Sequence, residues 1–111
     1  MFIAMNRFQV NPGQEDTFEE MWRSRETHLQ QVPGFLVFSL LRNAPMGETQ
    51  TTEYISHSTW ASRADFEAWT QSEAFSRGHA QGSVQGVLAG PPVVSLYDTV
   101  LHQEKAQAET R

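Results

Sequence analysis

The segment from Phe35 to Leu41 constrains the fold most, because six of its seven residues are large and apolar. In an extended strand, alternate side chains point to opposite faces. The two alternating sets are Phe35, Val37 and Leu41, and Leu36, Phe38 and Leu40. A sheet with water on one face alternates apolar and polar residues. The sequence therefore predicts that both faces of this sheet are covered, the second of them by the same face of another subunit.

The spacing of apolar residues along the rest of the chain predicts the order of strands and helices. Strands are expected at residues 2–10, 35–41, 51–60 and 91–101, and helices at 14–31, 63–69 and 73–80. Ser62 and Ser72 are expected to cap the two shorter helices. This βαββαβ order, with its second helix in two pieces, predicts a ferredoxin-like α+β fold. Its sheet would be antiparallel, with the helices on one face.

Length and composition limit the kinds of function. A chain of 111 residues is expected to form one domain, which we place at residues 1–102, followed by a polar tail at 103–111. The absence of cysteine excludes disulfides, thiolate catalysis and iron–sulfur clusters. A net charge of -5 without a basic cluster argues against a nucleic-acid partner. Residues 1–10 are too short for a signal peptide or a membrane span, so we expect a soluble cytoplasmic protein.

Asn6 is unusual because it lies in the middle of an apolar strand face. Its neighbours on that face are Phe2, Ala4, Phe8 and Val10. Asparagine is poorly suited to the interior of a strand, and a buried amide needs hydrogen-bond partners. Two interpretations stay open: Asn6 bonds a nearby backbone group, or its amide faces a ligand between the sheet and the broken helix.

Trp69 and His79 are the other two candidates. Trp69 follows Phe66 at helical spacing, which is typical of a core stripe. His79 follows Gly78 near the expected end of a helix, where it could interact with the last carbonyls. The alternative is that the indole is a flat wall and the imidazole an axial ligand for a planar iron macrocycle. A bend at Gln71-Ser72 would bring the two together around a pocket.

No other chemical motif competes with this arrangement. His28, His57 and His102 are expected to be ordinary surface or edge residues. The chain has no Ser/His/Asp arrangement, no phosphate loop and no motif for covalent haem attachment. A single neutral imidazole is enough to hold haem iron and leaves the opposite face open for oxygen.

The sequence resembles the IsdG-type haem-degrading monooxygenases of the antibiotic biosynthesis monooxygenase superfamily, which are dimeric α+β barrels. The likeness covers Met1 to about Leu101. Its matching pieces are Asn6-Arg7, Pro33-Gly34-Phe35, the run from Trp60 to His79, and Val94–Val100.

The resemblance implies roles for three residues. His79 would be the proximal iron ligand, Asn6 the distal donor near bound oxygen, and Trp69 the wall that distorts the macrocycle. It also implies a cytoplasmic homodimeric haem oxygenase that uses O2 and electrons from an external reductase. Such an enzyme opens the porphyrin ring and releases iron. Two alternatives remain: a cofactor-independent monooxygenase acting on a quinol or polyketide-like phenol, and a haem-binding protein that does not degrade its ligand.

Overall fold

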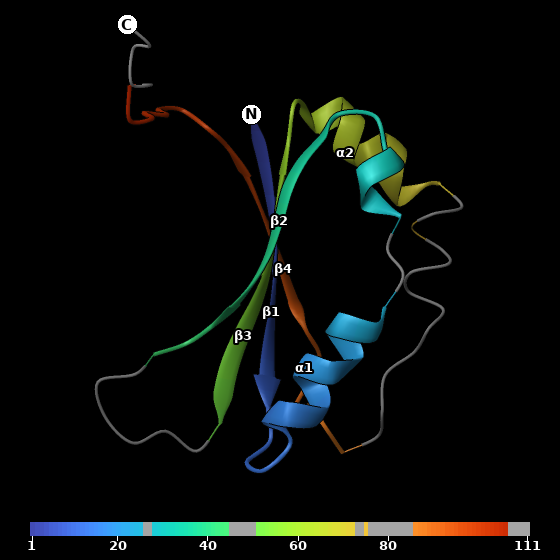
Figure 1. Ribbon diagram of the computed structural model, residues 1–111, viewed down its shortest axis with the longest axis vertical. Coiled ribbons are helices and arrows are strands. Elements are labelled where there is room, and N and C mark those ends of the chain that lie inside the picture. The colour runs from blue at the N-terminus through green and yellow to red at the C-terminus, as the bar shows by residue number, and fades with distance from the viewer. Residues whose placement is uncertain (26–27, 45–50, 73–74, 76–85, 107–111) are drawn as a thin grey trace, which may run out of the picture.

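The computed structural model describes residues 1–25, 28–44, 51–72, 75 and 86–106. Within these residues, four strands form one antiparallel sheet in the order β2-β3-β1-β4. The strands are β1 (Phe2–Val10), β2 (Phe35–Arg42), β3 (Thr52–Trp60) and β4 (Val93–Asp98). Figure 1 shows helices α1 (Glu15–Ser24) and α2 (Arg63–Thr70) on the same side of this sheet. The predicted ferredoxin-like α+β fold is confirmed.

The central strand β1 has the alternation that the sequence predicted. Phe2, Ala4, Phe8 and Val10 are buried on the helix side, and Asn6 shares their face. Strand β1 pairs with β3 along its whole length and with β4 from Phe2 to Arg7. The helix-side face of β1 therefore forms the middle of the surface on which the helices pack.

The first helix is shorter than predicted. Helix α1 ends at Ser24, Arg25 is extended, and His28 adopts a left-handed conformation before the 3₁₀ helix η1 (Leu29–Gln31). The expectation of one helix over residues 14–31 is therefore wrong. The break lets Leu29 bury its side chain with Phe2 and Trp60, in a different cluster from the one that contains Phe18 of α1.

Strand β2 departs from strict alternation. Its register with β3 shifts between Phe35 and Val37, which is the mark of a bulge that adds one residue to one strand. As a result, Phe35, Phe38 and Leu40 pack toward the helix side, whereas Leu36, Val37 and Leu41 are exposed. The predicted faces are therefore wrong for residues on one side of the bulge: Phe35 lies with Phe38 and Leu40, whereas it was predicted to lie with Val37 and Leu41.

Helix α2 begins where it was predicted to begin. The Ser62 hydroxyl accepts a hydrogen bond from the Asp65 backbone N–H at 3.1 Å, which confirms the cap. After α2, the backbone N–H of Phe75 donates to Ser72 Oγ at 3.2 Å, as expected of a second cap. The remainder of the predicted helix at residues 73–80 lies outside the described residues.

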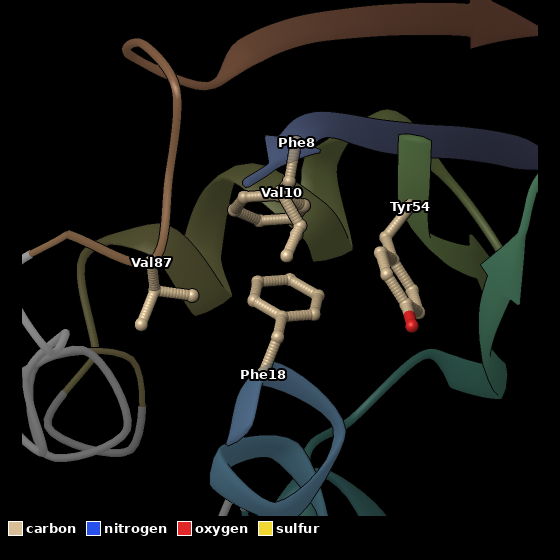
Figure 2. Close-up of a cluster of buried hydrophobic side chains, with 5 residues drawn as sticks. All are labelled: Phe8, Val10, Phe18, Tyr54 and Val87. Atoms are coloured by element: carbon tan, nitrogen blue, oxygen red, sulfur yellow. The ribbon is translucent and has the colours of Figure 1, made fainter. Parts of the chain in front are cut away.

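Among the described residues, two clusters of buried hydrophobic side chains lie on the helix side of the sheet. The first contains Phe8, Val10, Phe18, Tyr54 and Val87. Figure 2 shows the ring of Phe18 close to both Phe8 and Tyr54. The ring centroid of Phe18 lies 5.2 Å from that of Phe8 and 4.7 Å from that of Tyr54. The second contains Phe2, Leu29 and Trp60. No helix within the described ranges is long and apolar enough to cross a membrane.

Candidate functional site

A cavity of about 550 Å³ lies between the sheet and the helices, in contact with both core clusters. We call it the central cavity. Its lining is mostly apolar and includes Ala4, Asn6 and Phe8 of β1, Met21 and Trp22 of α1, Phe38 of β2, Ser56 and Ser58 of β3, Phe66 and Trp69 of α2, Val94 of β4, and Arg25, Leu29 and Phe75. This volume and this lining are typical of sites that enclose a small organic molecule.

Asn6 lies on the sheet side of the central cavity. It is directly opposite Ser56 on β3 and Val94 on β4. The amide oxygen Oδ1 is enclosed and has no hydrogen-bond partner among the described residues. An enclosed amide oxygen without a partner costs free energy, so its presence at a cavity wall points toward a polar ligand or a rearranged neighbour.

Trp69 faces both the aromatic core and the central cavity. Its ring centroid lies 5.1 Å from that of Trp60 and 6.0 Å from that of Phe66, within the second core cluster. The same indole lines the cavity and meets the ring of Phe75 edge-on at 4.8 Å. The structural and functional interpretations of Trp69 are therefore compatible, since one indole can pack in the core and also form a wall of the cavity.

The predicted bend after α2 is present and is held by Ser72. Its backbone N–H donates to the Trp69 carbonyl oxygen at 2.9 Å, and its hydroxyl donates to the same oxygen at 2.6 Å. Since Ser72 Oγ also accepts from the Phe75 N–H, the backbone is tied on both sides of the bend. This arrangement places Phe75 on the cavity beside Trp69.

His79 lies outside the described residues, so its role as an iron ligand stays a prediction. The other three histidines do not line the central cavity. His57 lies on the outer face of the sheet opposite Met5, and His102 Nε2 is 2.9 Å from a carboxylate oxygen of Glu104. His28 is exposed in a linker rather than on the first helix, where it was expected. The described residues contain no group of three His, Asp or Glu side chains that could hold a metal ion.

Arg25 is a site residue that the sequence analysis missed. It is the one charged side chain among the described residues that line the central cavity. Its guanidinium carbon lies 4.5 Å from the ring centroid of Trp22, and burial lowers its pKa. The chain leaves helical geometry at Arg25, so the helical pattern of the sequence could not show that this side chain reaches the cavity. The one signal in the sequence was that Arg25 follows Trp22 by three residues.

A polar cluster beside the cavity anchors α1 to the sheet. The Tyr54 hydroxyl donates to a carboxylate oxygen of Glu19 at 2.6 Å, and Arg42 of β2 lies 3.1 Å from the same oxygen. The hydrogen bond from Tyr54 lowers the pKa of Glu19, and burial together with Glu19 raises the pKa of Tyr54 to about 12. On the other side of this cluster, Trp22 stacks on Phe38 at 5.5 Å and forms part of the cavity wall.

Comparisons with known proteins agree with this architecture. Residues 1–81 match the family described as antibiotic biosynthesis monooxygenase. A heme-degrading monooxygenase of Shouchella clausii (strain KSM-K16) is 32% identical over 110 residues, which cover 98% of this chain and 100% of that protein.

Solved structures share the fold. MhuD, a heme-degrader from Mycobacterium tuberculosis solved with two hemes bound in its active site, has a TM-score of 0.73 at 27% identity, with 94% of this chain and 100% of that chain covered. SnoaB, a cofactor-independent oxygenase from Streptomyces nogalater, has a TM-score of 0.65 at 16% identity, with 94% and 97% covered, and shows the fold alone. The family match over most of the chain and the full-length relative show that this protein belongs to the antibiotic biosynthesis monooxygenase family.

Proposed function

We propose that this protein is a haem-degrading monooxygenase whose substrate binds in the central cavity. The observation that carries the proposal is an apolar cavity of about 550 Å³ with the Asn6 amide on its wall. The full-length relative that is named a heme-degrading monooxygenase supports it, as does the similarity to MhuD.

The described residues fit a flat, largely apolar ring that carries carboxylates. Trp22, Phe66 and Trp69 provide aromatic walls. Arg25 provides a cation at the same cavity, where a partly desolvated guanidinium favours a carboxylate partner. His79 would hold the iron, and the hydrogen bonds of Ser72 place Phe75, four residues before it, on the cavity.

Each side chain then has a distinct task. Trp69 would press on the ring from a position fixed by Trp60 and Phe66, and the apolar lining would exclude water. Asn6 would donate a hydrogen bond from its amide nitrogen at the reacting centre. When bound, haem supplies the iron that activates O2 with electrons from an external reductase, and its own ring is the substrate. Opening of the ring would release iron.

The functional unit that we propose is a homodimer. The outer face of the sheet exposes apolar side chains on both edge strands, among them Leu41 of β2 and Val93 of β4. The division into a domain at residues 1–102 and a tail at 103–111, and the cytoplasmic location, stay predictions.

Haemin titration of the purified protein tests the proposal. The wild type should give the absorbance of histidine-ligated haem, and His79→Ala should lose it. His57→Ala and His102→Ala are matched controls that should keep it, because both residues lie away from the central cavity. Addition of a reductant in air should then bleach the wild-type complex and release iron.

Two results would contradict the proposal. Haemin bound without bleaching would indicate a binding protein that does not degrade its ligand. The absence of haemin binding would instead favour the cofactor-independent oxygenation of a quinol or polyketide-like phenol in the same cavity.

A further inference from the structure

Asn6 and Ser56 form a polar pair on the wall of the central cavity. The two residues are directly opposite in the antiparallel pairing of β1 and β3, and both line the cavity. In such pairs the Cβ atoms lie roughly 5 Å apart, which a serine hydroxyl and an asparagine amide span with one hydrogen bond. The residues beyond this pair in the same row are Leu40 of β2 and Val94 of β4, and neither side chain has a polar group.

The other nearby hydroxyls of β3 on this face already have partners. The Ser58 hydroxyl accepts from the Trp60 indole N–H at 3.0 Å and donates to the Ala4 carbonyl oxygen at 3.4 Å. The Tyr54 hydroxyl donates to Glu19. Ser56 alone of these three residues has no side-chain hydrogen bond within the described residues, while Oδ1 of the facing Asn6 lacks a donor.

We propose that Ser56 is a positioning residue, whose hydroxyl turns to donate to Asn6 Oδ1 and thereby fixes the orientation of the amide. Rotation about the Cα–Cβ bond of Ser56 moves the hydroxyl between staggered positions without displacing the backbone, and a bond formed in this way would satisfy the enclosed oxygen. Within the described residues the amide nitrogen makes no hydrogen bond and is not one of the enclosed atoms that lack a partner, so it is the end that remains for the cavity. With Oδ1 held by Ser56, Nδ2 is presented to the ligand as a donor.

The orientation of the Asn6 amide would then depend on Ser56 of β3 as well as on Asn6 of β1. A free amide can rotate and present either its oxygen or its nitrogen to a ligand, and only the nitrogen donates. The hydrogen bond between the two side chains is independent of what the cavity binds. Its consequence for catalysis rests on the proposed haem chemistry, in which a donor is required at the reacting centre.

The hydrogen bond is tested in the ligand-free protein by nuclear magnetic resonance. The side-chain NH2 signals of Asn6 are identified by their loss in Asn6→Ala. In Ser56→Ala the Nδ2 signal should move upfield, because a donor at Oδ1 withdraws electron density from the amide nitrogen. Ser56→Thr retains a hydroxyl and should restore the wild-type position. Ser39→Ala is the control, since Ser39 is exposed and lies opposite His57 on the outer face.

The role in catalysis is tested with haemin-loaded protein. Ser56→Ala should bind haemin as the wild type does but bleach about tenfold more slowly, because a misdirected donor lowers rate more than affinity. Ser56→Thr should recover most of the rate. Circular dichroism confirms that each variant is folded.

The outcomes separate the two proposals. Unchanged Asn6 signals in folded Ser56→Ala would overturn the positioning role, even if bleaching slowed. A shifted Nδ2 signal in a protein that binds no haemin would support the hydrogen bond and refute the haem function. A shifted signal with wild-type bleaching would overturn the catalytic consequence.

Discussion

The indole of Trp69 has two environments, and each affects how a substitution there is interpreted. One side belongs to the aromatic cluster with Trp60 and Phe66, and the other lines the central cavity. Truncation to alanine would remove core packing worth about 3–5 kcal/mol of folding free energy as well as the cavity wall. A substitution that retains an aromatic ring is therefore the more informative probe of function.

Asn6→Ala and Trp69→Phe should bind haemin nearly as the wild type does and degrade it slowly. Loss of a donor that acts along the reaction path typically lowers the rate by about 100-fold. The measurement is the rate of haem bleaching by reductant and oxygen in saturated complexes. Wild-type rates in both variants would show that the distal-site assignment is wrong, and loss of binding in both would indicate purely structural roles.

The sequence located part of the site, and the limits have physical causes. Asn6 and Trp69 were found because an amide on an apolar strand face and an aromatic residue at core spacing are local signals, and both line the central cavity. Arg25 and Ser56 were missed. The position of Arg25 depends on how the chain turns after Ser24, and Ser56 gains meaning only from its pairing with Asn6 across 50 residues.

At the scale of elements, local patterns gave the strands and the faces of β1, but not the faces of β2. The predicted bounds of β1 and β3 are correct to within one residue, since their alternation is visible along the chain. The faces of β2 could not be predicted, because the bulge lies in a run where almost every residue is apolar. The last strand, expected at 91–101, is confined to Val93–Asp98, where β1 provides a hydrogen-bonding partner.

The turn into β2 requires glycine at position 34. Gly34 has φ of +82°, and a Cβ there would collide with the side chain of Asp65 at the start of α2. Gly34→Ala should therefore lower the free energy of unfolding by about 2–4 kcal/mol, from backbone strain together with the clash. Gly13→Ala is the matched control, since Gly13 has φ of +83° and a Cβ added there would meet nothing within 4 Å. Equal losses in urea denaturation would show that the contact with Asp65 is unimportant.

The link between Tyr54 and Glu19 should contribute to stability in a manner that depends on pH. Tyr54→Phe removes a hydrogen bond to a carboxylate and should cost about 1–2 kcal/mol at neutral pH. Because the bond lowers the pKa of Glu19 in the fold, its contribution is present above the ordinary value of 4.5. It is lost as the pH falls through the lower pKa of the folded state.

At alkaline pH, the contribution of Tyr54 to stability falls as the pH rises. Burial and Glu19 raise the pKa of Tyr54 from 10.0 to about 12, so its contribution to stability decreases as the pH rises from 10 to 12. Denaturation of wild type and Tyr54→Phe across both ranges measures the two effects. The control is Tyr97→Phe on the exposed face of β4. A difference between Tyr54→Phe and wild type that does not change with pH would contradict the assignment.

At the scale of the whole molecule, the outer face of the sheet carries exposed apolar side chains from both edge strands. Its exposed apolar side chains include Val37, Leu41, Val93 and Tyr97, with 50%, 45%, 58% and 45% of their surface accessible. Exposed apolar surface of this kind marks an interface. The proposed homodimer would cover it.

Leu41→Glu should dissociate this homodimer, because it would bury an unpaired carboxylate at the interface. Thr17→Glu on the exposed side of α1 adds the same charge away from the sheet and is the control. The sequence assigned Leu40 to the same face as Leu36, but Leu40 packs toward the core, so Leu40→Glu would destabilise the fold instead. Sedimentation at micromolar concentration is the measurement, and a monomeric wild type would refute the dimer.

The central cavity also has a consequence for the lifetime of the protein. The apolar side chains that line this cavity of about 550 Å³ would gain dispersion contacts when a ligand fills it. A ligand present at 100 times its dissociation constant would add about 2.7 kcal/mol to the folding free energy. Since the unfolded fraction is what proteases degrade, an increment of this size changes abundance several-fold. The amount of protein in the cell would then rise and fall with the supply of the molecule it binds, without any transcriptional control.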